Sequence, residues 1–291
     1  EYQAKSFNRA FSERQPGSAI KPFLYAAALE NGYTPLSFKD VSETTFTYDS
    51  GRKEYTPKNV NNKFAEEEIS LLQAMAISDN IYAVKTLVDI GYDEYRDILK
   101  RFNLKYEQQD LPTIALGTKE NTLYNLTAAY NMIASKGQSI PATTILSIEN
   151  SEGEVIYEYE QPKNKQVISE EDAFLLTDMM TGMFDATLSD YSPATGLSIR
   201  PKMTHTYAGK SGTTNTDQWM IGYTPTLTAG VWNGYDQGKT LTTQTDLAAT
   251  KRIWIDFMES ALAGTKKQTF EVPDGVEGVL IDIETGKLAT D

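Results

Sequence analysis

The chain of 291 residues contains no cysteine and a single histidine, His205. Without cysteine it can form no disulfide, no thiolate metal site and no thiol nucleophile. A zinc site with two or three histidine ligands is excluded because the chain has only one histidine. A Ser-His-Asp triad would have to use His205, which we interpret instead as a polar residue entering a strand. We therefore expect no metal and no cofactor, and lysine remains as the candidate general base for a serine enzyme.

The chain also lacks long hydrophobic runs and an excess of positive charge. Its apolar runs are far shorter than the roughly 20 residues that a membrane-spanning helix needs, and no signal peptide opens it. Lys and Arg number 27 against 40 Asp and Glu, a net charge of −13 at pH 7. An acidic surface repels phosphate backbones, so we expect no nucleic-acid partner. The chain begins without an initiator Met, and we expect it to be an excised fragment of a longer protein.

What is present is an ordinary globular balance, with 40% hydrophobic and 23% charged residues. This composition suits one large domain, and the chain shows no repeat, low-complexity tract or linker. Apolar residues recur with helical spacing in seven segments. We predict helices over residues 18–32, 69–77, 80–91, 93–102, 122–136, 169–184 and 245–262.

Alternating patterns predict the strands, and residues 33–64 suggest a long surface excursion with short strands. The predicted strands cover 44–48, a hairpin of 144–148 and 154–159, then 205–214, 218–223, 227–233 and 279–283. Helices thus dominate the middle of the chain and antiparallel strands its late part. We predict an α+β fold in which an antiparallel sheet is flanked by helices, with a mainly helical lobe inserted at about residues 60–200.

The sequence Ser18-x-x-Lys21 precedes the apolar run 23–29, and Pro16-Gly17 predicts a turn into that helix. Residues three apart on a helix share a face, so the Lys21 amine is expected to reach the Ser18 hydroxyl. A serine at a helix N-terminus also faces free backbone N–H groups, which suits a nucleophile and an oxyanion. Taken alone, this pattern is most often solvated surface.

Two further motifs follow in order. Ser78-Asp79-Asn80 lies at the break between two predicted helices, and Lys210-Ser211-Gly212-Thr213-Thr214 lies in a predicted strand. Alone, the first is most simply a helix N-cap and the second a polar strand end. Together, in this order and these contexts, the three motifs resemble those of the penicillin-recognising serine acyl-transferases.

The chemistry of acyl transfer gives each motif a role. Ser18 is expected to be the nucleophile, and Lys21 its base, provided that its amine is neutral near pH 7. Burial and a nearby cation both lower the pKa of a lysine, and Lys210 is expected to be that cation. Ser78 is expected to relay a proton to the leaving amine.

The remaining motif residues are predicted to bind substrate. Asn80 is expected to bind a substrate amide, and the hydroxyls of Ser211 and Thr213 a terminal carboxylate. Gly212 is expected to leave the strand edge open, so that an extended peptide pairs there as an added strand. The N–H groups of Ser18 and Thr213 are expected to converge on the oxyanion.

Nearly the whole chain resembles the transpeptidase domain of a class A penicillin-binding protein of Gram-positive type. Besides the three motifs, the resemblance rests on 7–10 and 14–18 before the nucleophile, on 115–118 and on 219–225. It implies an enzyme that cleaves a terminal D-Ala-D-Ala bond in a peptidoglycan stem peptide and holds the acyl group on Ser18. The acyl group would pass to an amine of a second stem peptide, and β-lactams would acylate the same serine.

The resemblance further implies a parent protein anchored in the cell membrane, acting on its extracytoplasmic face with other cell-wall synthesis proteins. The present chain is then expected to be a soluble fragment without the anchor and the glycosyltransferase domain. It departs from the family at Ser211, where threonine is commoner, but both side chains carry a hydroxyl. The strands that normally precede residue 7 are missing, so we expect another segment to complete the sheet.

Other functions stay open at this point. A class A β-lactamase shares the motifs but needs a carboxylate to activate water, and the segment 120–125 offers Glu120 with a spacing one residue too long. We interpret Glu120 as a solvated or capping residue. A D,D-carboxypeptidase would transfer the acyl group to water, and the motifs do not separate it from a transpeptidase. A non-catalytic peptide-binding module is disfavoured by the intact serines and lysines. Trp219 and Trp232 are interpreted as core residues.

Overall fold

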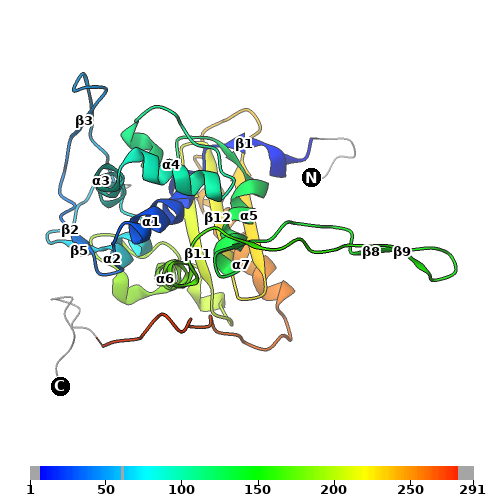
Figure 1. Cartoon of the computed structure of the whole chain (residues 1–291). Helices are drawn as coiled ribbons and strands as arrows, with labels where there is room; N and C mark the ends of the chain where they lie inside the picture. Colours follow the sequence, from blue (N-terminus) through cyan, green and yellow to red (C-terminus); the bar gives the residue numbers. More distant parts are fainter. Residues whose placement is uncertain (1–6, 60–61, 281–291) are drawn as a thin grey trace.

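The structure is a computed structural model that describes residues 7–59 and 62–280. Its central sheet has three antiparallel strands in the order β11-β12-β13 (Figure 1). They are β11 (Ala208–Thr213), β12 (Asp217–Tyr223) and β13 (Thr228–Gly234). Lys210 lies opposite Ile221, and Ser211 opposite Met220. The three predicted strands are thus confirmed, with small shifts at their ends.

All seven predicted helices are present. They are α1 (Lys21–Glu30), α2 (Leu71–Ile77), α3 (Asn80–Ile90), α4 (Tyr92–Arg101), α5 (Leu123–Ala134), α6 (Glu170–Thr181) and α7 (Gln244–Ala261). Side chains at Ser70, Asp79, Thr122, Ser169 and Thr243 cap the N-termini of five of them. These side chains accept hydrogen bonds from backbone N–H groups that have no partner inside the helix, which explains why the helices begin where they do.

Helix α1 differs from its prediction because it begins at Lys21 and not at Ser18. Residues Gly17–Ile20 form a separate 3₁₀ turn, η2. Pro22 explains the boundary, because proline has no N–H and fits only the first turn of an α-helix. Every residue of α1 except Glu30 is buried, and the helix packs against α3, α4 and α6 in the centre of the molecule (Figure 1). A helix that is apolar all round is expected in such a position.

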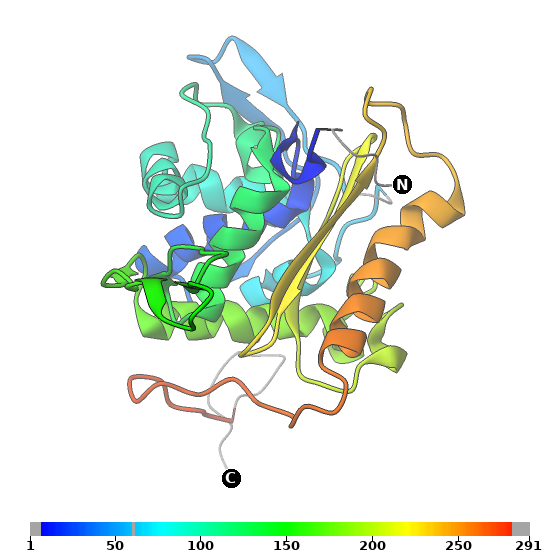
Figure 2. The same cartoon turned by 90° about the vertical axis from the view of Figure 1, so that its right-hand side faces the viewer.

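The sheet lies between two layers of helices. Figure 2 shows α7 on one side of the strands and α5 and α6 on the other, in agreement with the contacts between these elements. The larger hydrophobic core surrounds α1 and reaches the sheet through Trp219 and Ile221. A second core lies under α7 and includes Tyr207, Met220 and Trp254. The α+β architecture predicted from the sequence is confirmed.

Short elements complete the fold. The 3₁₀ turns are η1 (Arg9–Phe11), η3 (Pro112–Leu116), η4 (Gly182–Phe184), η5 (Ala186–Leu188) and η6 (Arg200–Lys202). Paired two- and three-residue strands are β1 (Glu13–Arg14) with β6 (Asn121–Thr122), β2 (Phe38–Lys39) with β5 (Ile69–Ser70), β3 (Phe46–Tyr48) with β4 (Lys53–Tyr55), and β7 (Gln138–Ser139) with β10 (Lys165–Gln166). The predicted hairpin is β8 (Ser147–Glu149) with β9 (Val155–Glu158), and it projects from the body of the molecule (Figure 1).

Three remaining predictions concern the last strand, membrane-spanning helices and the completion of the sheet. Residues 279–280 of the predicted strand 279–283 are irregular, and the rest of that strand lies outside the described residues. Within the described part of the chain, no helix is both long and apolar enough to cross a membrane. That another segment completes the sheet stays a prediction.

Candidate active site

A cavity of about 410 Å³ brings the three sequence motifs together. Ser18 comes from the turn η2, Ser78 and Asn80 from the junction of α2 and α3, and Ser211 and Thr213 from the edge strand β11. The opposite wall is an irregular segment that contributes Tyr191, Ser192, Pro193, Ala194, Thr195, Leu197 and Ser198. Ser18 and Lys251, which are 233 positions apart in sequence, therefore share one cavity.

Ser18 lies on a turn that two hydrogen bonds fix from the core. The indole N–H of Trp219 donates to the Gln15 carbonyl at 2.9 Å, and the Tyr130 hydroxyl donates to the Ala19 carbonyl at 2.7 Å. Ser18 itself is partly exposed, whereas Ala19 on its C-terminal side is buried. The turn thus holds the hydroxyl-bearing residue at the cavity wall while its neighbours are anchored.

Glycines allow strand β11 to approach this turn. A Cβ at Gly212 would lie 2.1 Å from the Pro16 carbonyl oxygen and 2.9 Å from the Ala19 nitrogen. Gly17 has φ +54°, and a Cβ there would lie 2.9 Å from the Thr213 carbonyl oxygen. The sequence suggested that Gly212 keeps the strand edge open for substrate. The structure shows another reason for a glycine at position 212, because only a residue without a Cβ allows the close contact between β11 and the Ser18 turn.

Ser78 has a strained backbone between α2 and α3. Its φ of 63° and ψ of 44° are in the left-handed region, which non-glycine residues seldom adopt. The next residue, Asp79, is buried and caps α3 by accepting from the Tyr82 N–H at 2.6 Å. It also accepts from the Asn59 amide at 2.9 Å and from the Tyr191 hydroxyl. These contacts hold Ser78 in its conformation.

The Ser78 hydroxyl lies between two lysine amines. Lys210 Nζ is 2.8 Å from Ser78 Oγ, and Lys21 Nζ is 3.3 Å from the same atom. Lys21 Nζ also donates to the carbonyls of Ser78 and Asp79, at 2.7 and 2.9 Å, and to Asn80 Oδ1 at 2.8 Å. These three oxygens can only accept, and they match the three N–H groups of an ammonium.

The direct contact that the Ser-x-x-Lys spacing predicted is absent. Among the described residues no hydrogen bond joins the Lys21 amine to the Ser18 hydroxyl, although Ser18 and the lysine's partner Ser78 line the same cavity. The physical reason is the local geometry, because Ser18 lies in a 3₁₀ turn and Lys21 in the α-helix that follows it. The side-chain spacing of a continuous α-helix therefore does not apply to this pair.

Both lysines are completely buried, and their pKa values fall as a result. Burial lowers the pKa of Lys21 to about 7, while the Asp79 carboxylate acts in the opposite direction. Burial, followed by the charges of Lys21 and Lys251, lowers the pKa of Lys210 well below its ordinary value. From the sequence we expected the charge of Lys210 to lower the pKa of Lys21. In the structure, neighbouring cations lower the pKa of Lys210 instead. Because the two amines flank one hydroxyl, their protonation is coupled.

Sequence reasoning missed part of this site. Asn59, in the predicted surface excursion, is buried and accepts from the Asn80 N–H at 2.9 Å. The Asn80 side chain donates to the Lys58 carbonyl at 2.8 Å, so the end of the excursion packs against the site. Tyr191 and Lys251 also line the cavity. None of these residues lies in a recognisable motif, so no local signal marked them.

Two residues considered as alternatives lie elsewhere. His205 is partly buried outside the cavity, and its ring is within hydrogen-bond distance of the Thr204 and Thr265 hydroxyls. Glu120 is exposed and does not line the cavity, and Thr122 rather than Glu120 caps α5. In the part of the chain that the structure describes, no group of three carboxylate or histidine side chains is arranged to hold a metal ion.

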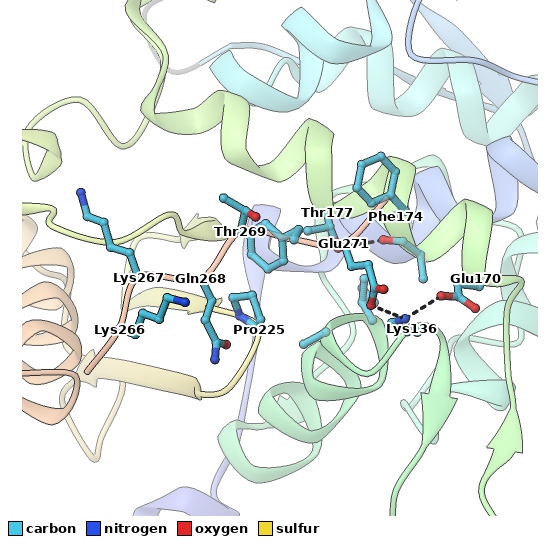
Figure 3. A pocket seen from close by; sticks show the side chains of 14 residues that line it. Lys136, Glu170, Phe174, Thr177, Pro225, Lys266, Lys267, Gln268, Thr269 and Glu271 are labelled. Atoms are coloured by element: carbon cyan, nitrogen blue, oxygen red, sulfur yellow. Dashed lines mark hydrogen bonds and ion pairs between the residues drawn. The ribbon is translucent and has the colours of Figure 1, made fainter. Parts of the chain in front are cut away.

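A second, larger cavity of about 540 Å³ lies beside the ends of α5 and α6 and is closed by residues 266–271 (Figure 3). Its lysine, Lys136, forms ion pairs of 3.0 Å with Glu170 and 2.8 Å with Glu271. None of the residues in the three motifs lines it. This cavity is larger but holds none of the motif residues, so volume alone does not identify the chemical site.

Comparison with known sequences identifies a matching family. Residues 1–259 match the model of a family described as the penicillin-binding protein transpeptidase domain. The chain is 44% identical over 287 residues to penicillin-binding protein 2D of Bacillus subtilis, covering 98% of this chain and 41% of that protein. It is 32% identical to penicillin-binding protein 1A of Aquifex aeolicus, covering 97% and 38% respectively. The chain therefore spans about two fifths of the length of these relatives.

Comparison with solved structures gives the same fold. The crystal structure of penicillin-binding protein 1A from Haemophilus influenzae superposes with a TM-score of 0.88 at 26% identity, covering 99% of this chain and 48% of that one. PonA1 of Mycobacterium tuberculosis, solved in complex with penicillin V, superposes with a TM-score of 0.76 at 23% identity, covering 92% and 74%. At that identity the second likeness concerns the fold alone.

Proposed function

This chain belongs to the family of penicillin-binding protein transpeptidase domains, and from that premise we propose that it is a D,D-transpeptidase acting through an acyl-enzyme on Ser18. Family membership is consistent with peptidoglycan transpeptidation and with a serine acyltransferase. The finer proposal is that the donor is a stem peptide ending in D-Ala-D-Ala and the acceptor an amine of a second stem peptide. β-Lactams, which resemble the donor, would acylate the same serine.

One observation carries the proposal, namely that the Ser78 hydroxyl lies between the amines of Lys21 and Lys210 in the cavity that Ser18 lines. A serine nucleophile without histidine needs a neutral amine nearby. Burial brings the pKa of Lys21 to about 7, so a useful fraction of neutral amine exists at physiological pH. A hydroxyl between two amines can also pass a proton in either direction.

The proposed first step is attack of Ser18 Oγ on the carbonyl carbon of the penultimate D-Ala. The serine proton passes to the neutral amine of Lys21, directly or through Ser78, and the backbone N–H groups of Ser18 and Thr213 bind the oxyanion. The C–N bond then breaks, and the proton returns through Ser78 to the departing amine of D-Ala. The products are free D-Ala and an ester on Ser18.

The proposed second step reverses these transfers with a different amine. The acceptor amine attacks the ester carbon and loses its proton to the Lys21–Ser78 pair. The C–O bond then breaks, and Ser18 regains its proton. Strand β11 has a free edge, since β12 is its only partner among the described residues. A peptide lying along β11 is a recognised mode of binding by strand addition, with Asn80, Ser211 and Thr213 as neighbouring polar groups.

Fluorescent penicillin tests the nucleophile directly. We expect one label per chain, mapped by peptide mass to Ser18, and a bond that persists for many minutes. The Ser18→Ala variant should keep its far-UV spectrum and melting temperature but lose the label. Labelling of the variant at an unchanged rate would remove Ser18 from this role.

The same reagents separate the alternatives. Rapid turnover of penicillin would indicate a β-lactamase-type hydrolase, and the exposed position of Glu120 disfavours it. Release of D-Ala from a pentapeptide without transfer to an added amine would indicate a D,D-carboxypeptidase. Failure of the folded chain to label at all would indicate a non-catalytic peptide-binding module. We extend the proposal to the longer parent protein, anchored in the cell membrane and acting outside it with other cell-wall synthesis proteins.

A further inference from the structure

A third lysine, Lys251 on α7, lines the catalytic cavity and belongs to none of the three motifs. It is partly buried and lines the cavity together with Ser211 and Thr213. Helix α7 packs against β12 and β13 on one face of the sheet (Figure 2). Met220, which lies opposite Ser211 in the sheet, belongs to the core under the same helix. Lys251 and Ser211 therefore lie on the same face of the sheet, which allows both side chains to line one cavity.

The hydrogen bonding of Lys251 is incomplete. Its amine donates to the Thr195 carbonyl at 2.6 Å, which uses one of the three N–H groups of an ammonium. No carboxylate of the described residues forms an ion pair with it. Lys202 provides a contrast, because its amine pairs with Asp256 on the exposed side of α7 at 2.5 Å. The same helix thus neutralises a surface lysine and leaves the cavity lysine without a counter-charge.

An uncompensated cation in such a place has an electrostatic cost. Burial lowers the pKa of Lys251, and the charge of Lys251 contributes to lowering the pKa of Lys210. A buried charge without a partner is unfavourable, and an anion that enters the cavity relieves the cost. The site therefore favours an anionic ligand group over a neutral group of similar shape.

We propose that Lys251 is a specificity-determining residue that holds the carboxylate of the substrate, together with the hydroxyls of Ser211 and Thr213. A carboxylate offers about four acceptor positions, enough for one ammonium and two hydroxyls. In a peptide ending in D-Ala, the carboxylate is one residue beyond the carbonyl that Ser18 attacks. A cation at that point selects substrate peptides with a free C-terminal carboxylate there and rejects amidated or longer peptides. This inference rests on the proposed function.

The test compares benzylpenicillin with its methyl ester, which lacks the negative charge. We expect the Lys251→Met variant to be acylated by the free acid about ten- to a hundredfold more slowly than the native chain, in line with the loss of a charge-assisted hydrogen bond. Acylation by the ester should change less than about threefold, since no ion pair is lost. Lys251→Arg should recover most of the rate with the free acid, and added salt should slow the native chain more than the Met variant.

Arg252 provides the matched control, because it is the adjacent cation on α7 and is exposed. The Arg252→Gln variant should react like the native chain with both compounds. If Lys251→Met slows both compounds equally, the lysine acts only by holding the Thr195 segment, and the inference is overturned. If the native chain reacts with neither compound, the proposed function itself fails, and the two failures are thereby distinguished.

Discussion

The two cavities described above are associated with lysines in opposite electrostatic situations. In the larger cavity, Lys136 is exposed, and its hydrogen bonds to Glu271 and Glu170 raise its pKa (Figure 3). Beside the smaller cavity, Lys21 and Lys210 contact its lining residue Ser78. Both are completely buried with no carboxylate bonded to either amine among the described contacts, and their pKa values fall. The same side chain is therefore a fixed cation in one place and a potential base in the other.

The difference shows that burial without a counter-charge, rather than the size of a cavity, marks the chemical site. A surface ion pair changes the stability of the protein little, and its lysine stays protonated at every physiological pH. A buried lysine without such a pair sits close to neutrality and can exchange a proton with a substrate. The carboxylate nearest to the buried lysines, Asp79, is itself occupied by a backbone N–H, an amide and a hydroxyl.

The largest expected effect comes from removing one lysine in each cavity. Lys210→Met should slow acylation by penicillin by about a thousandfold, because the hydroxyl of Ser78 loses its closer amine. Lys136→Met should leave the rate and the melting temperature unchanged, because its partners remain solvated. Stopped-flow acylation and thermal melts measure both. Equal rates for the two variants would break the distinction between the cavities.

The next effect concerns glycines beside each cavity. Gly212→Ala places a Cβ 2.1 Å from the Pro16 carbonyl oxygen, and Gly137→Ala places one 2.5 Å from the Ile168 carbonyl oxygen. Both substitutions should lower the melting temperature. Only Gly212→Ala should also reduce acylation of the remaining folded protein, by about a hundredfold, because it moves the Ser18 turn. The melting temperatures serve as the control for strain, and a comparable loss of rate in Gly137→Ala would contradict the assignment.

The smallest effect is a shift in pH dependence. Acylation should rise with pH through an acid limb near 7, because the base must be neutral and burial lowers the pKa of Lys21 to about 7. Asp79→Asn should move this limb to lower pH, because the carboxylate that favours the charged amine is lost. The variant should also be less stable, since three donors lose a carboxylate acceptor.

The rate profile of Asp79→Asn therefore needs to be measured at a temperature where the variant is fully folded. Glu170→Gln provides the control, because it removes a carboxylate from the larger cavity and should leave the acid limb in place. A limb that does not move in Asp79→Asn would mean that the titrating group is not Lys21. A limb that moves to higher pH would contradict the sign of the interaction.

Much of the fold could be predicted because its signals are local. Apolar periodicity and capping residues indicated all seven helices, and alternation indicated the three strands of the sheet. The prediction for α1 was wrong at its start, since Pro22 confines the first helical turn to residues near it. The end of the excursion at Asn59 was also misjudged, because its burial depends on Asp79, which is 20 residues away.

Parts of the site were likewise visible in the sequence. The motifs named Ser18, Lys21, Ser78, Asn80 and Lys210, and the structure brings the side chains of all five around one cavity or onto its lining groups. The roles of these residues stay predictions. Lys251 could not be found in this way, because the role that we propose for it depends on its place in the cavity, which results from the packing of α7 against the sheet.

The sequence by itself determined which chemistries were possible. The lack of cysteine and the single histidine excluded thiol nucleophiles, thiolate metal sites and zinc sites with several histidines, which left serine and lysine, and the order of the three motifs indicated the family. The tertiary structure decided the electrostatics, because a pKa depends on burial and on charges that are distant in the chain. The close approach of β11 to the Ser18 turn, which glycines permit, decided that these groups lie around one cavity.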